Sequence, residues 1–227
     1  MKIMTIFFND IKKDRGGFTL IELVMTIILI GILSIGLYEV VMWGISDYLQ
    51  NENYLHSSNS MTYASSVIRR NLENAATPIG LIKPNNAKAY CKLKKKINPA
   101  APGEPPIVLA NSNLKNQNTT CGVTGKPCNE VAFYKYITGT ANQELVVFCV
   151  NSNNNVLYKE VTASGKGKTA SYPVADNISG INFSPSVSFC NKNTSTGVYS
   201  CNINFTITNS AGYWQTGGVS VIVANPQ

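Results

Sequence analysis

The sequence has few of the residues on which enzyme active sites depend. It contains one histidine, His56, and charged residues make up only 14% of its 227 residues. It has no G-x-S-x-G, Walker, H-E-x-x-H or G-x-G-x-x-G motif, so the usual signatures of hydrolases, nucleotide-binding proteins and zinc proteases are missing. Acidic residues such as Glu130 and Asp176 are well separated, which argues against a calcium site. We therefore expect no enzyme activity, no cofactor and no metal.

The cysteines also lack the close C-x-x-C spacing that zinc sites need. An even number in a domain that faces away from the cytoplasm indicates disulfides. Cys190 and Cys201 flank a polar hairpin loop, and Cys121 and Cys128 flank a turn-rich loop, which leaves Cys91 to pair with Cys149. The alternative is that Cys91 pairs with Cys121 or Cys128. The six cysteines are Cys91, Cys121, Cys128, Cys149, Cys190 and Cys201.

Proline is absent from the first 77 residues, so nothing there interrupts a helix before Pro78. Residues 18–38 carry a single charge, Glu22. At ~1.5 Å rise per residue this segment is long enough to cross the ~30 Å hydrocarbon core of a bilayer. Apolar residues continue at helical spacing as far as Leu72. We expect one helix from about Thr19 to about Ala75, with a membrane segment at 18–45 and a stem at 46–76.

The segment that precedes this helix, MKIMTIFFNDIKKDRGG, is basic near its end. A secretory signal peptide has its apolar stretch before the cleavage site. Here the basic residues and Gly16-Gly17 come before the apolar stretch. A plain membrane anchor does not explain Glu22, because a carboxylate inside a membrane costs ~2–3 kcal/mol or more unless it is neutralised. Cleavage before Phe18 would create an α-amino group one helical turn away. Glu22 of one subunit could then neutralise the amine of its neighbour and fix the register of packed helices.

The run Gly17-Phe18-Thr19-Leu20-Ile21-Glu22-Leu23 resembles the class III leader junction of type IV prepilins and type II secretion pseudopilins. The resemblance implies that a prepilin peptidase removes residues 1–17, cuts between Gly17 and Phe18, and methylates Phe18. It assigns an assembly role to Glu22. It also implies a single-pass protein of the bacterial inner membrane with a periplasmic head, which joins other subunits and an assembly platform. Unlike many major pilins, the chain has no proline near Glu39.

Residues 77–227 are expected to form the head. The Pro-rich region 78–128 reads as irregular, with one short strand at Ile107–Ala110, and period-two alternation begins near Glu130. We expect an α+β fold in which the stem covers one face of an antiparallel sheet. The other candidate strands are Val131–Ile137, Glu144–Val150, Val156–Val161, Ile178–Ser184, Cys201–Thr208 and Val219–Val223.

The large head is typical of minor subunits, and the layout resembles J-type pseudopilins and W-type or MSHA-biogenesis minor pilins. We therefore expect a minor pilin or pseudopilin that primes or caps a filament. The alternative is an adhesive or DNA-uptake pilin that binds a target through the loop at 84–128. The net charge of +7 falls to +5 without residues 1–17, because four basic and two acidic residues leave with them. Lysines at 92 and 94–96 have no aromatics between them, which does not favour nucleic-acid binding.

Overall fold

The computed structural model describes residues 19–79, 82, 91, 106–110, 128–164 and 169–223. The chain falls into two compact units with their boundary between Tyr54 and Leu55. One helix, α1 (Leu20–Glu73), supplies all the secondary structure described in the first unit and enters the second. Antiparallel strands follow it, which confirms the α+β class expected from the sequence.

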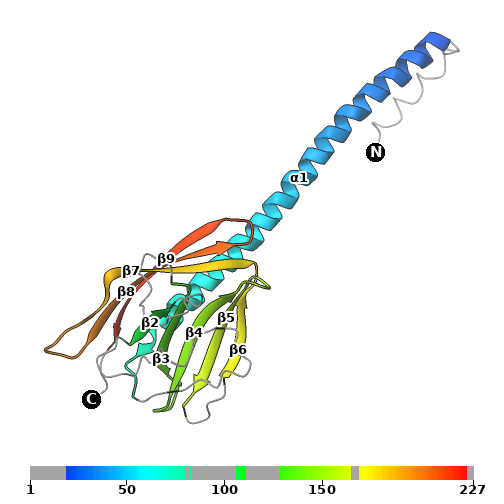
Figure 1. Cartoon of the computed structure of the whole chain (residues 1–227). Helices are drawn as coiled ribbons and strands as arrows, with labels where there is room; N and C mark the ends of the chain where they lie inside the picture. The colour runs from blue at the N-terminus through cyan, green and yellow to red at the C-terminus, as the bar shows by residue number, and fades with distance from the viewer. Residues whose placement is uncertain are drawn as a thin grey trace, which may run out of the picture. The chain divides into compact units, whose positions relative to one another are not determined.

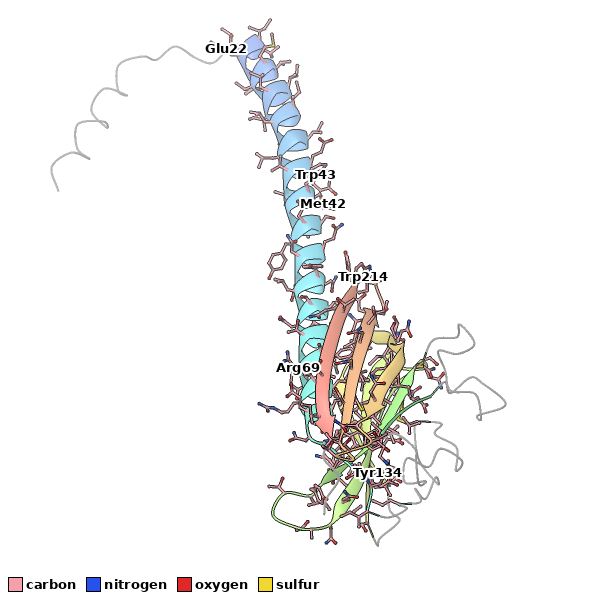
Figure 2. All side chains as sticks on the ribbon, turned by 90° about the vertical axis from the view of Figure 1, so that its left-hand side faces the viewer. Glu22, Met42, Trp43, Arg69, Tyr134 and Trp214 are labelled. Carbon is pink, nitrogen blue, oxygen red and sulfur yellow. A yellow bond between two sulfur atoms is a disulfide. The ribbon has the colours of Figure 1, made fainter. Side chains whose placement is uncertain are left out.

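In the first unit, every residue of α1 from Leu20 to Tyr54 is exposed. The helix is long and apolar enough there to cross a membrane, by length and composition. Figure 2 shows its side chains, including Met42 and Trp43, projecting outward from the ribbon. Because these apolar side chains are exposed, a lipid or a neighbouring helix must cover them in water.

The second unit carries two antiparallel sheets. The first has the order β1-β3-β4-β5-β6, with β2 also paired to β3, and the second has the order β7-β8-β9. Figure 1 shows β3–β6 side by side in one sheet and β7–β9 in the other. The strands are β1 (Ala75–Ala76), β2 (Ile107–Ala110), β3 (Glu130–Tyr136), β4 (Gln143–Asn151), β5 (Val156–Ala163), β6 (Thr169–Ala175), β7 (Ile178–Lys192), β8 (Tyr199–Asn209) and β9 (Trp214–Val223).

The main core lies where α1 and the inner faces of both sheets meet. The helix contributes an apolar stripe at spacings of three and four residues, which places its members on one face. Phe133 of β3 stacks on Phe148 of β4 with ring centroids 6.3 Å apart. Phe183 of β7 and Phe205 of β8 meet at 6.0 Å. The stripe consists of Met61, Ala64, Ile68 and Leu72, all buried.

A second apolar cluster covers the opposite face of the first sheet. Ile82 and Cys91 lie there against residues of β3, β4 and β5, among them Tyr134 and Tyr158. Strands β3 and β4 are therefore buried on both faces. The expectation of a single sheet covered on one face by the stem was wrong, because the described residues form two sheets and the first sheet has two covered faces.

Three strand predictions were also incomplete. Strand β6 was not predicted, because Pro173 cannot donate a ladder hydrogen bond and reads as a break. Strand β7 was expected to end at Ser184, before Pro185, yet it continues to Lys192 past one irregularity in its pairing with β8, between Pro185 and Cys190. Strand β9 begins at Trp214, before Gly217 and Gly218, and not at residue 219.

Gly217 is required by close packing. A Cβ at this position would lie 2.5 Å from Cζ of Phe205 and 3.0 Å from Oγ of Ser65 on α1. Only glycine lets β9 lie this close to the phenylalanine ring and the stem. The apparent strand breaker in the sequence is therefore a contact point of the head.

Candidate functional site

The start of α1 is a reciprocal cap between Thr19 and Glu22. The hydroxyl of Thr19 and its backbone N–H both donate to Glu22 Oε2, at 3.0 and 3.1 Å. The backbone N–H of Glu22 in turn donates to Thr19 Oγ1 at 3.4 Å. This T-x-x-E arrangement is a capping box, which satisfies backbone donors that the first turn of a helix leaves unpaired.

The cap gives Glu22 a role inside its own subunit that the sequence analysis missed. The sequence does contain the T-x-x-E spacing of a capping box, at Thr19 and Glu22. The carboxylate also lies in the first turn, at the positive end of the helix dipole. Figure 2 places Glu22 at the tip of the helix. Gly17 and Phe18, the predicted cleavage and methylation sites, lie outside the described residues.

The polar run 56–60 interrupts the apolar pattern of α1. Its side chains form hydrogen bonds with residues 176 and 177, which connect β6 of the first sheet to β7 of the second. Ser57 is buried at 3% exposure, and its Oγ accepts a hydrogen bond of 2.7 Å from Nδ2 of Asn177. Ser60 donates to Oδ1 of Asp176 at 3.1 Å. Asn177 has a positive φ of 58°, a conformation that asparagine tolerates better than most residues. These bonds fix the passage from β6 to β7 against the stem.

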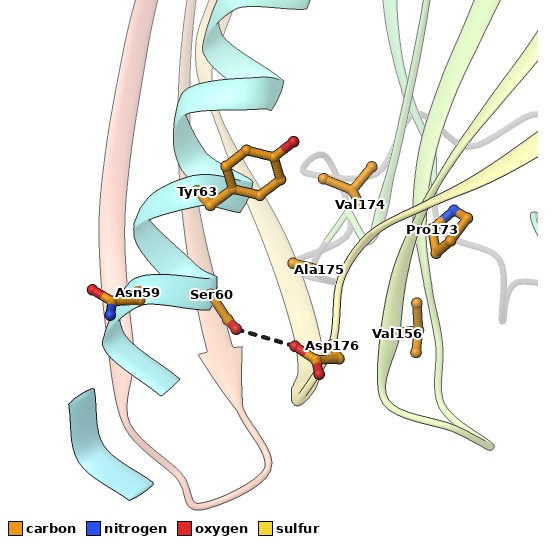
Figure 3. A pocket seen from close by; sticks show the side chains of 8 residues that line it. All are labelled: Asn59, Ser60, Tyr63, Val156, Pro173, Val174, Ala175 and Asp176. Atoms are coloured by element: carbon orange, nitrogen blue, oxygen red, sulfur yellow. Dashed lines mark hydrogen bonds between the residues drawn. The ribbon is translucent and has the colours of Figure 1, made fainter. Parts of the chain in front are cut away.

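A groove of about 450 Å³ lies beside this turn, between α1 and strands β5 and β6 (Figure 3). The side chains of Tyr63 and Pro173 face it from opposite sides, and the Ser60–Asp176 hydrogen bond closes its lower end. Its lining is mostly apolar and holds one carboxylate, that of Asp176. The groove is lined by Asn59, Ser60, Tyr63, Val156, Pro173, Val174, Ala175 and Asp176.

Two pairs of cysteines within the described residues are at bonding distance. Sγ of Cys91 lies 2.08 Å from that of Cys149, across the second apolar cluster. Sγ of Cys190 lies 2.03 Å from that of Cys201, and the two residues are register partners in β7 and β8. Cys128 is also disulfide-bonded. Its predicted partner Cys121 lies outside the described residues, so that pairing stays a prediction.

The charged residues of the first sheet include a half-buried group on β3, β4 and β5. Nζ of Lys135 lies 2.9 Å from Oε1 of Glu144, with both side chains about one-fifth exposed or less. Burial lowers the pKa of the nearby Lys159, and the positive charge of Lys135 lowers it further, while Glu144 opposes both effects. On the other face, burial raises the pKa of Tyr134, whose Oη accepts a hydrogen bond from the backbone N–H of Ile82.

The regions assigned to target binding fall largely outside the described residues. Most of the loop at 84–128 and all four lysines of its basic cluster lie there. His56, expected to be a surface or stem residue, is exposed on α1. Arg69, expected on a solvated face, pairs with Glu73 at 2.9 Å, and both side chains are exposed.

Comparison with known proteins places one motif on the chain. A family model described as the prokaryotic N-terminal methylation motif matches residues 12–38, which include the Gly17–Phe18 junction and the Thr19–Glu22 cap. Neither the search of curated proteins nor the search of solved structures returns a match.

The motif, the long apolar helix and the α+β head together define a class of protein. They fit the pilin and pseudopilin family, and the motif supports a type IV pilin or pseudopilin subunit anchored in a membrane by its N-terminal helix. A class III leader of this kind implies processing by a prepilin peptidase and assembly with other pilin subunits.

Proposed function

We propose that this chain is a minor pilin or pseudopilin, a structural subunit that primes or caps assembly of a type IV pilus or type II secretion pseudopilus. The observation that carries the proposal is the start of α1. The methylation motif, an uninterrupted apolar helix and an acidic residue in the first turn occur there together. The head is held to the inner membrane on its periplasmic side until the subunit enters the filament.

In this account Glu22 acts twice. Within the subunit its carboxylate caps α1 through Thr19. Cleavage after Gly17 makes Phe18 the N-terminal residue, directly before Thr19, so that the α-amino group of the mature chain lies beside the cap. In a bundle of parallel helices, the carboxylate of one subunit neutralises the methylated amine of the next, which removes an unpaired charge from the membrane interior.

The two roles of Glu22 can be separated by substitution. Glutamine at this position of a capping box still accepts the Thr19 hydrogen bonds but carries no charge. Glu22→Ala removes the charge and the side-chain half of the cap, while the backbone N–H of residue 22 can still donate to Thr19. We expect both variants to insert into the membrane at least as well as the wild type, because each removes a charge from the apolar segment. We expect both to lose co-purification with partner subunits, since the intersubunit ion pair is gone.

Glu52→Gln provides the matched control, because Glu52 is an exposed acidic residue of the same helix beyond the apolar segment. It should enter the filament like the wild type. Normal recruitment of Glu22→Gln, together with poor recruitment of Glu22→Ala, would show that the residue serves only as a helix cap. The proposed pairing mechanism would then be wrong.

A further inference from the structure

One face of the second sheet is not covered by the stem. The stem lies against alternate residues of β9, because it donates a hydrogen bond of 3.4 Å to Oε1 of Gln215, and a Cβ at Gly217 would meet Ser65 of α1. Successive side chains of a strand point to opposite faces, so Gly218 belongs to the outer face. A Cβ at Gly218 would lie 2.9 Å from Oδ1 of Asn204, on the neighbouring strand β8. Asn204 is exposed, so this outer face is open to a partner.

Hydroxyl and amide side chains form rows across this outer face. Asn182, Thr206 and Thr216 are register partners on β7, β8 and β9. Asn202 and Ser220 form a second row on β8 and β9, in which Oγ of Ser220 donates to Oδ1 of Asn202 at 2.7 Å. All of these residues are exposed except Thr206, which is half-buried. These two rows contain no charged and no large apolar side chain, and each of their side chains can both donate and accept hydrogen bonds.

The two ends of the outer face carry an exposed indole and a pocket. Trp214 is 69% exposed, and Figure 2 shows it at one end of β9. At the other end, a pocket of about 560 Å³ is lined by Asn191, Ser200 and Ile222. These three residues form one row across β7, β8 and β9. The rise of a strand places Trp214 and Ile222 about 27 Å apart, so the indole, the polar rows and the pocket form one elongated surface.

We propose that the outer face of the second sheet binds an extended, uncharged polysaccharide. A sugar ring presents hydroxyl groups at its edge, which donate and accept hydrogen bonds as the side chains of the polar rows do. Its ring face is made of C–H groups, which can stack on the exposed indole of Trp214. The length of the surface accommodates several sugar units in a row, with one end of the chain in the pocket beside Ile222.

The composition of the face argues against other classes of partner. Nucleic acids are bound mainly through lysine and arginine, which are absent from the two polar rows. The cores of protein interfaces are enriched in aromatic residues and arginine and depleted in serine, whereas these rows consist of hydroxyls and amides. Lys192 also lines the pocket, but its Nζ lies over the ring of Tyr199, 5.5 Å from the centroid. A ligand rich in hydroxyls and without charge is therefore the best match.

Tryptophan fluorescence of the full chain, in a detergent without a sugar headgroup, tests the proposal. Trp43→Phe leaves Trp214 as the only tryptophan of the chain. Titration with cellohexaose, maltohexaose and chitohexaose should shift the emission of Trp214 to the blue with at least one of them, because the sugar covers the indole. No shift with any of the three would overturn the proposal. A shift that follows the protein concentration and not the sugar would also overturn it, because a second copy would then cover the face.

Calorimetric titration of variants with the sugar that binds locates the site. Trp214→Ala should weaken binding about tenfold, through the lost stacking. Asn204→Ala should weaken it about fivefold, through the lost hydrogen bonds. The matched controls are Tyr172→Ala, at an exposed aromatic residue of β6, and Asn153→Ala, at an exposed amide between β4 and β5. Both controls should bind like the wild type, and equal losses in variants and controls would show that the sugar binds elsewhere.

Two further variants separate this proposal from the alternatives. Lys192→Gln should leave binding unchanged, because the ligand carries no charge. A large loss in Lys192→Gln, together with a steep fall of affinity with salt, would show that the pocket binds an acidic ligand and that the proposal is wrong. Glu22→Gln leaves the second sheet unchanged and should bind the sugar like the wild type, whether or not the assembly role of Glu22 is correct.

Discussion

Replacing Leu72 by alanine tests how the stem is held to the head. Leu72 lies at the end of the buried stripe of α1 and is fully buried in the main core, where the helix and both sheets meet. Leu55 lies on the same helix within the same unit and is 59% exposed. The two positions differ in burial and share their residue type and helix, so they form a matched pair.

The expected magnitudes follow from that difference. Truncating a fully buried leucine to alanine costs about 2–5 kcal/mol, because the transfer free energy of the removed atoms is lost and a cavity is left behind. The same change at an exposed helix position costs less than about 0.5 kcal/mol, and alanine is a good helix former there. Leu72→Ala should therefore lower the free energy of unfolding of the head several-fold more than Leu55→Ala.

Denaturant unfolding of the full chain in detergent, followed by near-UV circular dichroism, measures both values. Non-reducing gels should first show that the disulfides are intact, so that the comparison reports packing alone. Equal effects of the two substitutions, or a cost below about 1 kcal/mol for Leu72→Ala, would refute the docking of the stem through its buried stripe.

Three further predictions concern the head. Ser57→Ala should destabilise it by about 1–2 kcal/mol in denaturant unfolding, because the part-buried amide of Asn177 loses its acceptor, whereas Ser66→Ala on the exposed side of α1 should change little. Burial raises the pKa of Tyr134, so its stabilising contribution is complete below pH 10.0 and is lost as pH rises through the folded-state pKa. The unfolding free energies of wild type and Tyr134→Phe should therefore converge above pH 10.0. Joint replacement of Cys190 and Cys201 by alanine should cost about 2–3 kcal/mol.

Much of the architecture could be predicted, because the helical periodicity of α1 and the period-two alternation of several strands are clear in the sequence. The apolar periodicity of α1 runs without proline from residue 20 to 72, and the structure places the helix at Leu20–Glu73. Strands β4 and β8 exceed their predicted bounds by one or two residues at each end. Period-two alternation shows which side chains of a strand are buried but not which strands share a sheet, so the division into two sheets did not follow from it.

The missed features are those in which tertiary contacts override local preference. The serine-rich run around Ser57 reads as a weak part of the stem, yet it binds the turn at Asn177. The glycine pair beginning at Gly217 reads as a break, yet the ring of Phe205 requires it. Glu22 was predicted to be costly in a membrane, but its hydrogen bonds to Thr19 were not predicted, although the T-x-x-E spacing of a capping box is present in the sequence.

The N-terminus of the mature protein gives the most direct test of the central claim. Mass spectrometry of the chain from cells with an active prepilin peptidase should find a polypeptide that begins with methylated Phe18. A Gly17→Val variant should keep residues 1–17, because the bulkier side chain blocks access to the bond, while Gly16→Val, one residue away, should still be cut. An intact leader on the wild-type chain, or a first residue other than Phe18, would contradict the account.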